Sequence, residues 1–114
     1  MSDQNIVHIQ LKRCDLFKLS GRFDSSGAHG VDDALRVVMD QGRYRIVLDL
    51  AETTYISSGF LRVLVATAKE TRRFNRGDLY LVALSPRLQD VMKLAGLTEL
   101  FKIFNTPEEA VGAW

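Results

Sequence analysis

The sequence predicts an α/β fold: one domain built on a mixed, mostly parallel sheet of about five strands, with helices packed on it. Apolar runs of strand length alternate with amphipathic helical patterns, in the order β-β-α-β-α-β-α-β-α. Two of these runs, residues 46–50 and 79–84, are almost continuously apolar, which is typical of parallel strands covered on both faces. A chain of 114 residues can bury one sizeable core, so we expect residues 1–114 to form a single domain.

The first two strands should form a hairpin. Residues 6–11 and 14–19 have the composition of strands, and only Lys12 and Arg13 separate them. Ser25 or Ser26 then provides a cap for the first helix, and Gly42 is a suitable residue to end it. The apolar positions of this helix are three, four and three residues apart and therefore share one face: Ala28, Val31, Leu35 and Val38.

The third strand, residues 44–50, should run into a turn-forming segment before the second helix, which we expect from Gly59 to about Phe74. Residues 79–84 form the fourth strand, and Ser85 followed by a proline starts a third helix that stops at Gly96. A short strand at 101–104 and a capping-box pattern from Thr106 complete the order. The expected buried face of the second helix consists of Leu61, Leu64, Val65 and Ala68.

Net charge, cysteine count and hydropathy exclude several classes of protein. The net charge of +1 argues against a dedicated nucleic-acid or membrane-surface protein. The single Cys14 cannot form an internal disulfide, and no apolar run reaches the roughly 18 residues of a membrane span. Because the first residues also lack the pattern of a signal peptide, we expect a cytoplasmic protein.

Two adjacent serines, Ser57 and Ser58, stand between a buried strand and the start of the second helix. Backbone N–H groups are unpaired at a helix N-terminus and the helix dipole favours negative charge, so this is a natural place to carry or bind a phosphoryl group. The serines also suit a simple helix cap. No catalytic residues accompany them, which indicates a protein that is acted upon or that binds, and not an enzyme.

An ordered set of segments resembles the STAS domain, and more narrowly the bacterial anti-sigma factor antagonists. The set spans essentially the whole chain: residues 19–24 (LSGRFD), the strand at 46–50, residues 55–59 (YISSG) and residues 95–97 (AGL). The resemblance implies a partner that is both an anti-sigma factor and a serine kinase. Phosphorylation of a serine at the start of the second helix would abolish binding, and a serine phosphatase would restore it.

The family motif places the phosphorylated serine at Ser58, with Ser57 as the alternative. In many members an aspartate precedes that serine and a serine and a glycine follow it, where this chain has Ser57, Gly59 and Phe60. The family's loop aspartate corresponds to Asp24, which the resemblance places near the phosphorylated serine. The expected partner-binding residues are Asp24, Tyr55, Ser57, Ser58, Gly59, Phe60, Arg62 and Val63.

Two of these assignments have an alternative interpretation. Phe60 is either part of a second layer of the core or an apolar anchor for the partner. Arg62 belongs to a basic side of the second helix, which is either a solvated face or a surface that steers an acidic partner.

Other functions remain as alternatives. A STAS scaffold or transport-complex subunit would bind its partner constitutively, and a nucleotide-binding module would use the same helix N-terminus for an anion. His8, His29 and Cys14 lack the spacing of metal ligands, so we expect no metal and no cofactor. We expect a monomer or a weak dimer, with Trp114 at the C-terminus as one possible contact.

Overall fold

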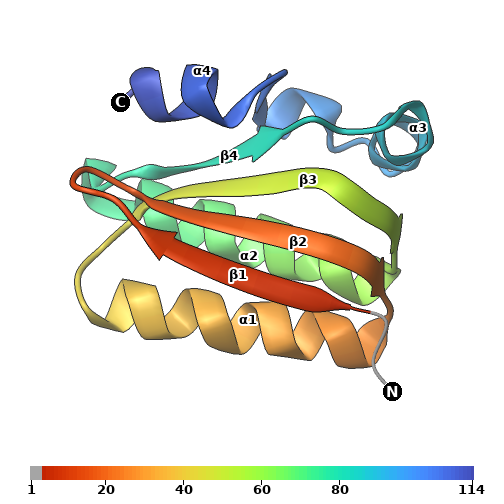
Figure 1. The fold of residues 1–114 in the computed structure, drawn as a ribbon, viewed down its shortest axis with the longest axis horizontal. Coiled ribbons are helices and arrows are strands. Elements are labelled where there is room, and N and C mark those ends of the chain that lie inside the picture. The colour runs from red at the N-terminus through yellow and green to blue at the C-terminus, as the bar shows by residue number, and fades with distance from the viewer. Residues whose placement is uncertain (1–3) are drawn as a thin grey trace.

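The computed structural model describes residues 4–114 and shows one five-stranded sheet in the order β1-β2-β3-β4-β5 (Figure 1). Strand β1 is antiparallel to β2, and the remaining neighbours are parallel. The predicted α/β fold with a mixed, mostly parallel sheet is therefore confirmed. The strands are β1 (Asn5–Gln10), β2 (Asp15–Phe23), β3 (Arg45–Ile56), β4 (Asp78–Val82) and β5 (Lys102–Phe104).

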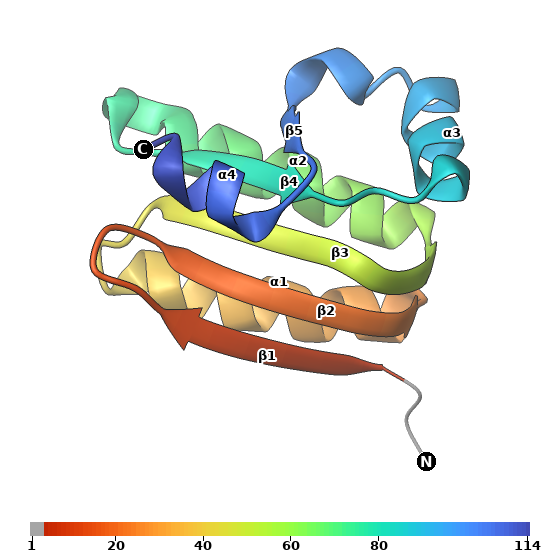
Figure 2. The same cartoon turned by 45° about the horizontal axis from the view of Figure 1, so that its top comes forward.

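Helices cover both faces of this sheet. Figures 1 and 2 show α1 and α2 side by side on one face, α4 on the opposite face, and α3 beyond the end of β4. Among the described residues no helix is long and apolar enough to cross a membrane. The helices are α1 (Ser25–Asp40), α2 (Ser58–Arg72), α3 (Pro86–Leu94) and α4 (Pro107–Gly112), with short 3-10 turns η1 (Arg73–Asn75) and η2 (Thr98–Leu100).

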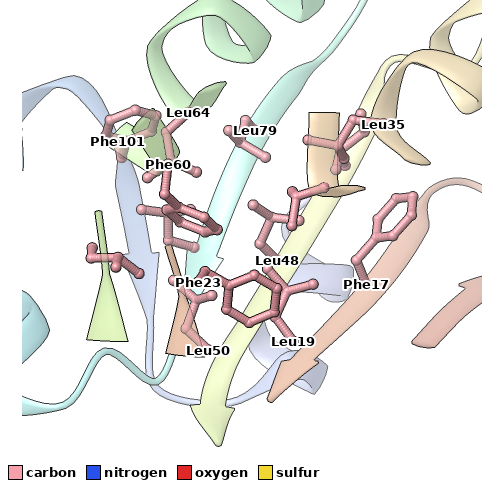
Figure 3. Packing of buried hydrophobic residues seen from close by; sticks show 14 of the residues in the cluster. Phe17, Leu19, Phe23, Leu35, Leu48, Leu50, Phe60, Leu64, Leu79 and Phe101 are labelled. Carbon is pink, nitrogen blue, oxygen red and sulfur yellow. The ribbon is translucent and has the colours of Figure 1, made fainter. Parts of the chain in front are cut away.

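Two apolar clusters explain the nearly continuous apolar strands. Along β3, Ile46, Leu48 and Leu50 join the main core beneath α1 and α2, parts of which Figure 3 shows. Val47 faces the other way and joins a smaller cluster that includes Tyr80 and is covered by α4. The central strands are thus buried on both faces, as their composition predicts.

Strand β3 is longer than expected and continues to Ile56 instead of ending at Leu50. It continues because β2 also runs on to Phe23 and pairs with it as far as Ile56, with register shifts on either side of Ser20 and Gly21. Thr53 becomes buried within this extension and donates a hydrogen bond to the carbonyl of Leu19 at 2.8 Å. The supposed turn-forming segment is therefore sheet, and the serine pair follows it without an intervening loop.

Three helix details also differ from the expectations. The first helix is capped by Asp24, not by Ser25 or Ser26. Helix α2 ends at Arg72, because Phe74 and Asn75 take left-handed backbone conformations with φ of 58° and 55°. Its buried face is rotated by about one residue from the expected one, because α1 packs beside it as well as the sheet beneath it. The buried residues are Phe60, Leu64, Thr67, Ala68 and Thr71.

Candidate functional site

The candidate site lies where β2 and β3 end and α1 and α2 begin. Phe23 and Ile56 are the last paired residues of the two strands, and the next backbone N–H, that of Ser57, donates to the carbonyl of Phe23 at 2.9 Å. Because both strands are parallel and end together, the N-termini of both helices lie at one edge of the sheet (Figure 1). The sequence positions around Asp24 and Ser57 are thereby brought together, although more than thirty residues separate them in the chain.

Asp24 and Ser57 have equivalent roles at the two helix N-termini. The Asp24 carboxylate accepts a hydrogen bond from the N–H of Gly27 at 2.8 Å, and the Ser57 hydroxyl oxygen accepts one from the N–H of Phe60 at 3.1 Å. Each satisfies one of the otherwise unpaired N–H groups and contributes about 1 kcal/mol to stability. Asp24 remains exposed, whereas only 8% of the Ser57 surface is accessible.

Ser58 is the first residue of α2 and is exposed. Its hydroxyl takes part in no hydrogen bond among residues 4–114, so it is not committed to the fold. The helix dipole at this position stabilises negative charge. The two serines therefore differ in environment as well as position, because the Ser57 hydroxyl is a buried cap and the Ser58 hydroxyl is exposed.

Gly59 lies where the starts of the two helices pack against each other. A β-carbon at this position would lie 3.8 Å from the Cα atom of Ser25 and 3.8 Å from the Cβ atom of Ala28. A methyl group fits at such distances, but a longer side chain would push against α1. Gly59 therefore has a structural role in the site, because α1 limits the size of the side chain at this position.

Tyr55 and Arg22 form the sheet side of the site. They are register partners on β3 and β2, and the Arg22 guanidinium lies 4.5 Å from the centroid of the Tyr55 ring. Tyr55 keeps 39% of its surface accessible. The ends of β2 and β3 therefore present a partly exposed aromatic ring with a cation stacked on it. Arg22 was not among the predicted site residues, since its contribution depends on the strand register.

The assignment of Phe60 to partner binding needs correction, because Phe60 is completely buried. Its ring packs against that of Phe23, with centroids 5.6 Å apart and planes tilted by 49° (Figure 3). Phe60 is therefore a core residue and not an apolar anchor for a partner. Phe60 fixes the first turn of α2 onto the sheet and has no surface left for a partner.

Apolar surface is instead available one residue further along α2. Leu61 and Val65, which we expected in the core, are half-buried and line a groove with Ala95 and Leu97 beyond α3. The exposed Arg62 lies at the same groove, which has a volume of about 280 Å³. Val63 is half-buried and packs against the main core. Sequence spacing alone does not reveal this groove. A rotation of α2 by one residue decides whether Phe60 or Leu61 is buried, and the spacing fits both.

Four basic residues in and just after α2 fall into two groups. Arg72 pairs with Asp78 at 2.7 Å and Arg76 with Glu70 at 3.0 Å, so these two are structural. Arg62 and Lys69 are exposed and form no ion pair among the residues that the structure describes. Within the same part of the chain, no three histidine, cysteine or acidic side chains gather as metal ligands would.

Comparison with known proteins identifies the family of this chain. The family model of the STAS domain matches residues 5–110. The Bordetella bronchiseptica protein BtrV, named as a candidate anti-sigma factor antagonist, is 35% identical over 96 residues, which is 84% of this chain and 82% of BtrV. The anti-sigma-B factor antagonist of Listeria monocytogenes is 32% identical over 98 residues, covering 86% of this chain and 84% of that protein.

The fold also matches a solved structure of the Bacillus cell fate determinant SpoIIAA in its phosphorylated form. The TM-score is 0.77 at 17% identity, and the match covers 96% of this chain and 98% of SpoIIAA. The family model, the relatives and the fold lead to one conclusion: the chain belongs to the STAS domain family.

Proposed function

We propose that this protein is an anti-sigma factor antagonist that binds an anti-sigma factor serine kinase and is switched off when that kinase phosphorylates Ser58. The observation that carries the proposal is the accessibility of the Ser58 hydroxyl at a helix N-terminus, beside a Ser57 hydroxyl that is buried and already used as a cap. The names of the relatives support the regulatory role. A serine phosphatase would reset the switch.

The proposed binding surface consists of exposed groups around that hydroxyl. Asp24 lies at the start of the neighbouring helix α1, Tyr55 lies near the end of β3, and Arg62 follows one turn along α2. Val63 is half-buried against the main core, so only its accessible part can contact the partner. Ser57, Gly59 and Phe60 support this surface by capping the helix, by letting it approach α1 and by fixing it to the core.

Charge is sufficient to operate the switch. A phosphoryl group brings roughly −1.5 to −2 charges at pH 7. The N-terminus of α2 accommodates this charge, so the free protein keeps its fold. Against a carboxylate of the partner about 5 Å away, at an effective dielectric constant near 20, even one added charge costs roughly 3 kcal/mol. That cost corresponds to about a hundredfold loss of affinity, so no conformational change is required.

The proposal is tested by incubating the protein with its candidate kinase and ATP, then reading intact mass, the modified peptide and complex formation. We expect one phosphoryl group on Ser58 and dissociation of the complex. Ser25→Ala is a matched control for Ser58→Ala, because Ser25 is the exposed first residue of the neighbouring helix α1. Ser58→Ala should block the modification, and Ser25→Ala should not.

Two results would contradict the proposal. Normal phosphorylation of the Ser58→Ala protein would place the switch elsewhere. A stable complex that gains no mass under these conditions would instead indicate a subunit that binds its partner constitutively.

A further inference from the structure

A basic pocket lies at the opposite end of the sheet from Ser58. The turn between β1 and β2, the connection from α1 to β3 and the segment after η1 meet there, as the left side of Figure 1 shows. The pocket has a volume of about 340 Å³. Five cationic side chains line it together with one acidic residue: Lys12, Arg13, Arg43, Arg45, Arg76 and Asp15.

The fold holds Arg43 in a fixed position. Its Nε donates to the Asp15 carboxylate at 2.6 Å, and its Nη2 donates to the carbonyls of Leu11 at 2.6 Å and Cys14 at 3.2 Å. These bonds tie the α1–β3 connection to the β1–β2 turn. They leave Nη1 without a hydrogen bond to any residue in the range 4–114.

Arg76 is held in a comparable way. Its Nη2 donates to the Glu70 carboxylate at 3.0 Å, and its guanidinium lies 3.7 Å from the centroid of the Tyr44 ring. Its Nη1 has no partner among the described residues either. Both arginines therefore have donors in place before any ligand arrives, which lowers the entropy lost on binding.

The positive charge of the pocket is only partly neutralised within the protein. Asp15 is completely buried, and its second oxygen is taken by His8 at 2.7 Å. Glu70 offsets Arg76. Lys12, Arg13 and Arg45 form no ion pair in the described part of the chain, so about three positive charges converge without compensation. A net charge of only +1 for the whole chain makes this local excess more notable.

We propose that this pocket binds a small molecule carrying two or more linked phosphoryl groups. Guanidinium groups match phosphate oxygens with paired hydrogen bonds, and lysine supplies a further point charge. A ligand with a single charge would leave most of the excess unbalanced. The concave shape formed by three chain segments favours a compact anion over an extended acidic surface. The site shares no residue with the Ser58 surface, so it stands independently of the proposed function.

Isothermal titration of the full chain with inorganic pyrophosphate and tripolyphosphate, at constant ionic strength, tests this proposal. We expect saturable binding at one site. Neutralising the exposed turn with the double variant Lys12→Gln/Arg13→Gln should weaken it by about tenfold or more. The control Lys69→Gln/Arg87→Gln removes the same charge from exposed positions on α2 and α3. It should leave the affinity unchanged.

Absence of saturable binding would overturn the proposal. So would an equal loss in both double variants, because it would show that only the net charge of the protein matters. An oligoglutamate peptide provides the third arm of the experiment. If that peptide binds more tightly than tripolyphosphate, the pocket receives an acidic protein segment and the assignment to small phosphates is wrong.

Discussion

Ser57 and Ser58 show how adjacent identical side chains acquire different roles. The Ser57 hydroxyl is buried at the end of β3 and is committed to the N–H of Phe60. Ser58 is the first residue of α2, and its side chain is exposed. The sequence predicts that one of the two caps the helix. It does not say which, because that depends on where α2 begins: a start at Gly59, as expected, would make Ser58 the cap, whereas the helix begins at Ser58 and Ser57 caps it.

The capping role predicts unequal losses of stability. Ser57→Ala removes the acceptor for the Phe60 N–H and should lower the free energy of unfolding by about 1 kcal/mol. Ser58→Ala removes a hydroxyl without a hydrogen-bond partner in residues 4–114 and should change it by less than about 0.5 kcal/mol. Urea denaturation of both variants at one pH measures the difference. Equal losses would mean that the cap is shared between the two serines.

The phosphorylation switch makes a separate prediction about affinity. Ser58→Glu places one negative charge beside the expected partner surface and should weaken binding of the anti-sigma factor by about tenfold to a hundredfold. Gln10→Glu adds the same charge at an exposed position at the other end of the sheet and serves as the control. Titration of the labelled anti-sigma factor with each variant gives the two affinities. Retained binding by Ser58→Glu would contradict electrostatic control at this position.

Helix α2 illustrates the limit of reading a buried face from spacing. Leu61 and Val65 are as apolar as Leu64, so the sequence alone supports a face centred on them. In the structure α1 packs alongside, and the buried face rotates to include Thr67 and Thr71. The Thr71 hydroxyl donates to the carbonyls of Thr67 and Ala68, which removes the cost of burying it. Such local satisfaction of polar side chains is not visible as a hydrophobic pattern.

The rotated face can be tested by paired truncations. Phe60→Ala should lower the free energy of unfolding by about 3–5 kcal/mol, because it empties a fully buried site against Phe23. Leu61→Ala should cost less than about 2 kcal/mol, since this side chain is only half-buried. Chemical denaturation of the two variants compares them directly. A larger loss for Leu61→Ala would restore the face expected from the sequence.

The order of elements was predictable, whereas their lengths depended on neighbours. Continuous apolar runs identified β3 and β4, and a proline after Ser85 marked the start of α3. The extension of β3 was not apparent, because Glu52 and Thr53 resemble a turn until β2 pairs with them. Arg22 was missed as a site residue for the same reason, since its contact with Tyr55 arises only from that pairing.

The two proposed sites lie at opposite ends of the molecule, separated by the length of α2. Its 15 residues span roughly 22 Å at about 1.5 Å per residue. Ser58 lies at the start of this helix, and the basic pocket lies beyond its end at Arg76. The balanced overall charge argued against a dedicated nucleic-acid or membrane-surface protein, and it gives no sign of this local excess of positive charge. The basic pocket forms because three chain segments meet in the fold, which cannot be inferred from composition alone.

The face of the sheet opposite α1 and α2 gives the last prediction, which concerns pH. Cys14 is 1% exposed within the cluster covered by α4, and burial raises the pKa of its thiol. In the unfolded chain a thiol has a pKa of about 8.5. Because the folded pKa is the higher one, the folded state favours the neutral thiol. This contribution is complete below pH 8.5 and is lost as the pH rises through the folded pKa.

Between about pH 8.5 and 10, the wild-type protein should therefore lose stability faster than Cys14→Ala, by at most about 1.4 kcal/mol per pH unit. Tyr80, whose pKa is also raised by burial, is present in both proteins and cancels in the comparison. The cavity left by the substitution lowers stability at every pH without changing the slope. Urea denaturation at several pH values yields both slopes. Parallel slopes would show that the thiol ionises as readily in the folded protein as in the unfolded chain, and that α4 leaves this face open to water.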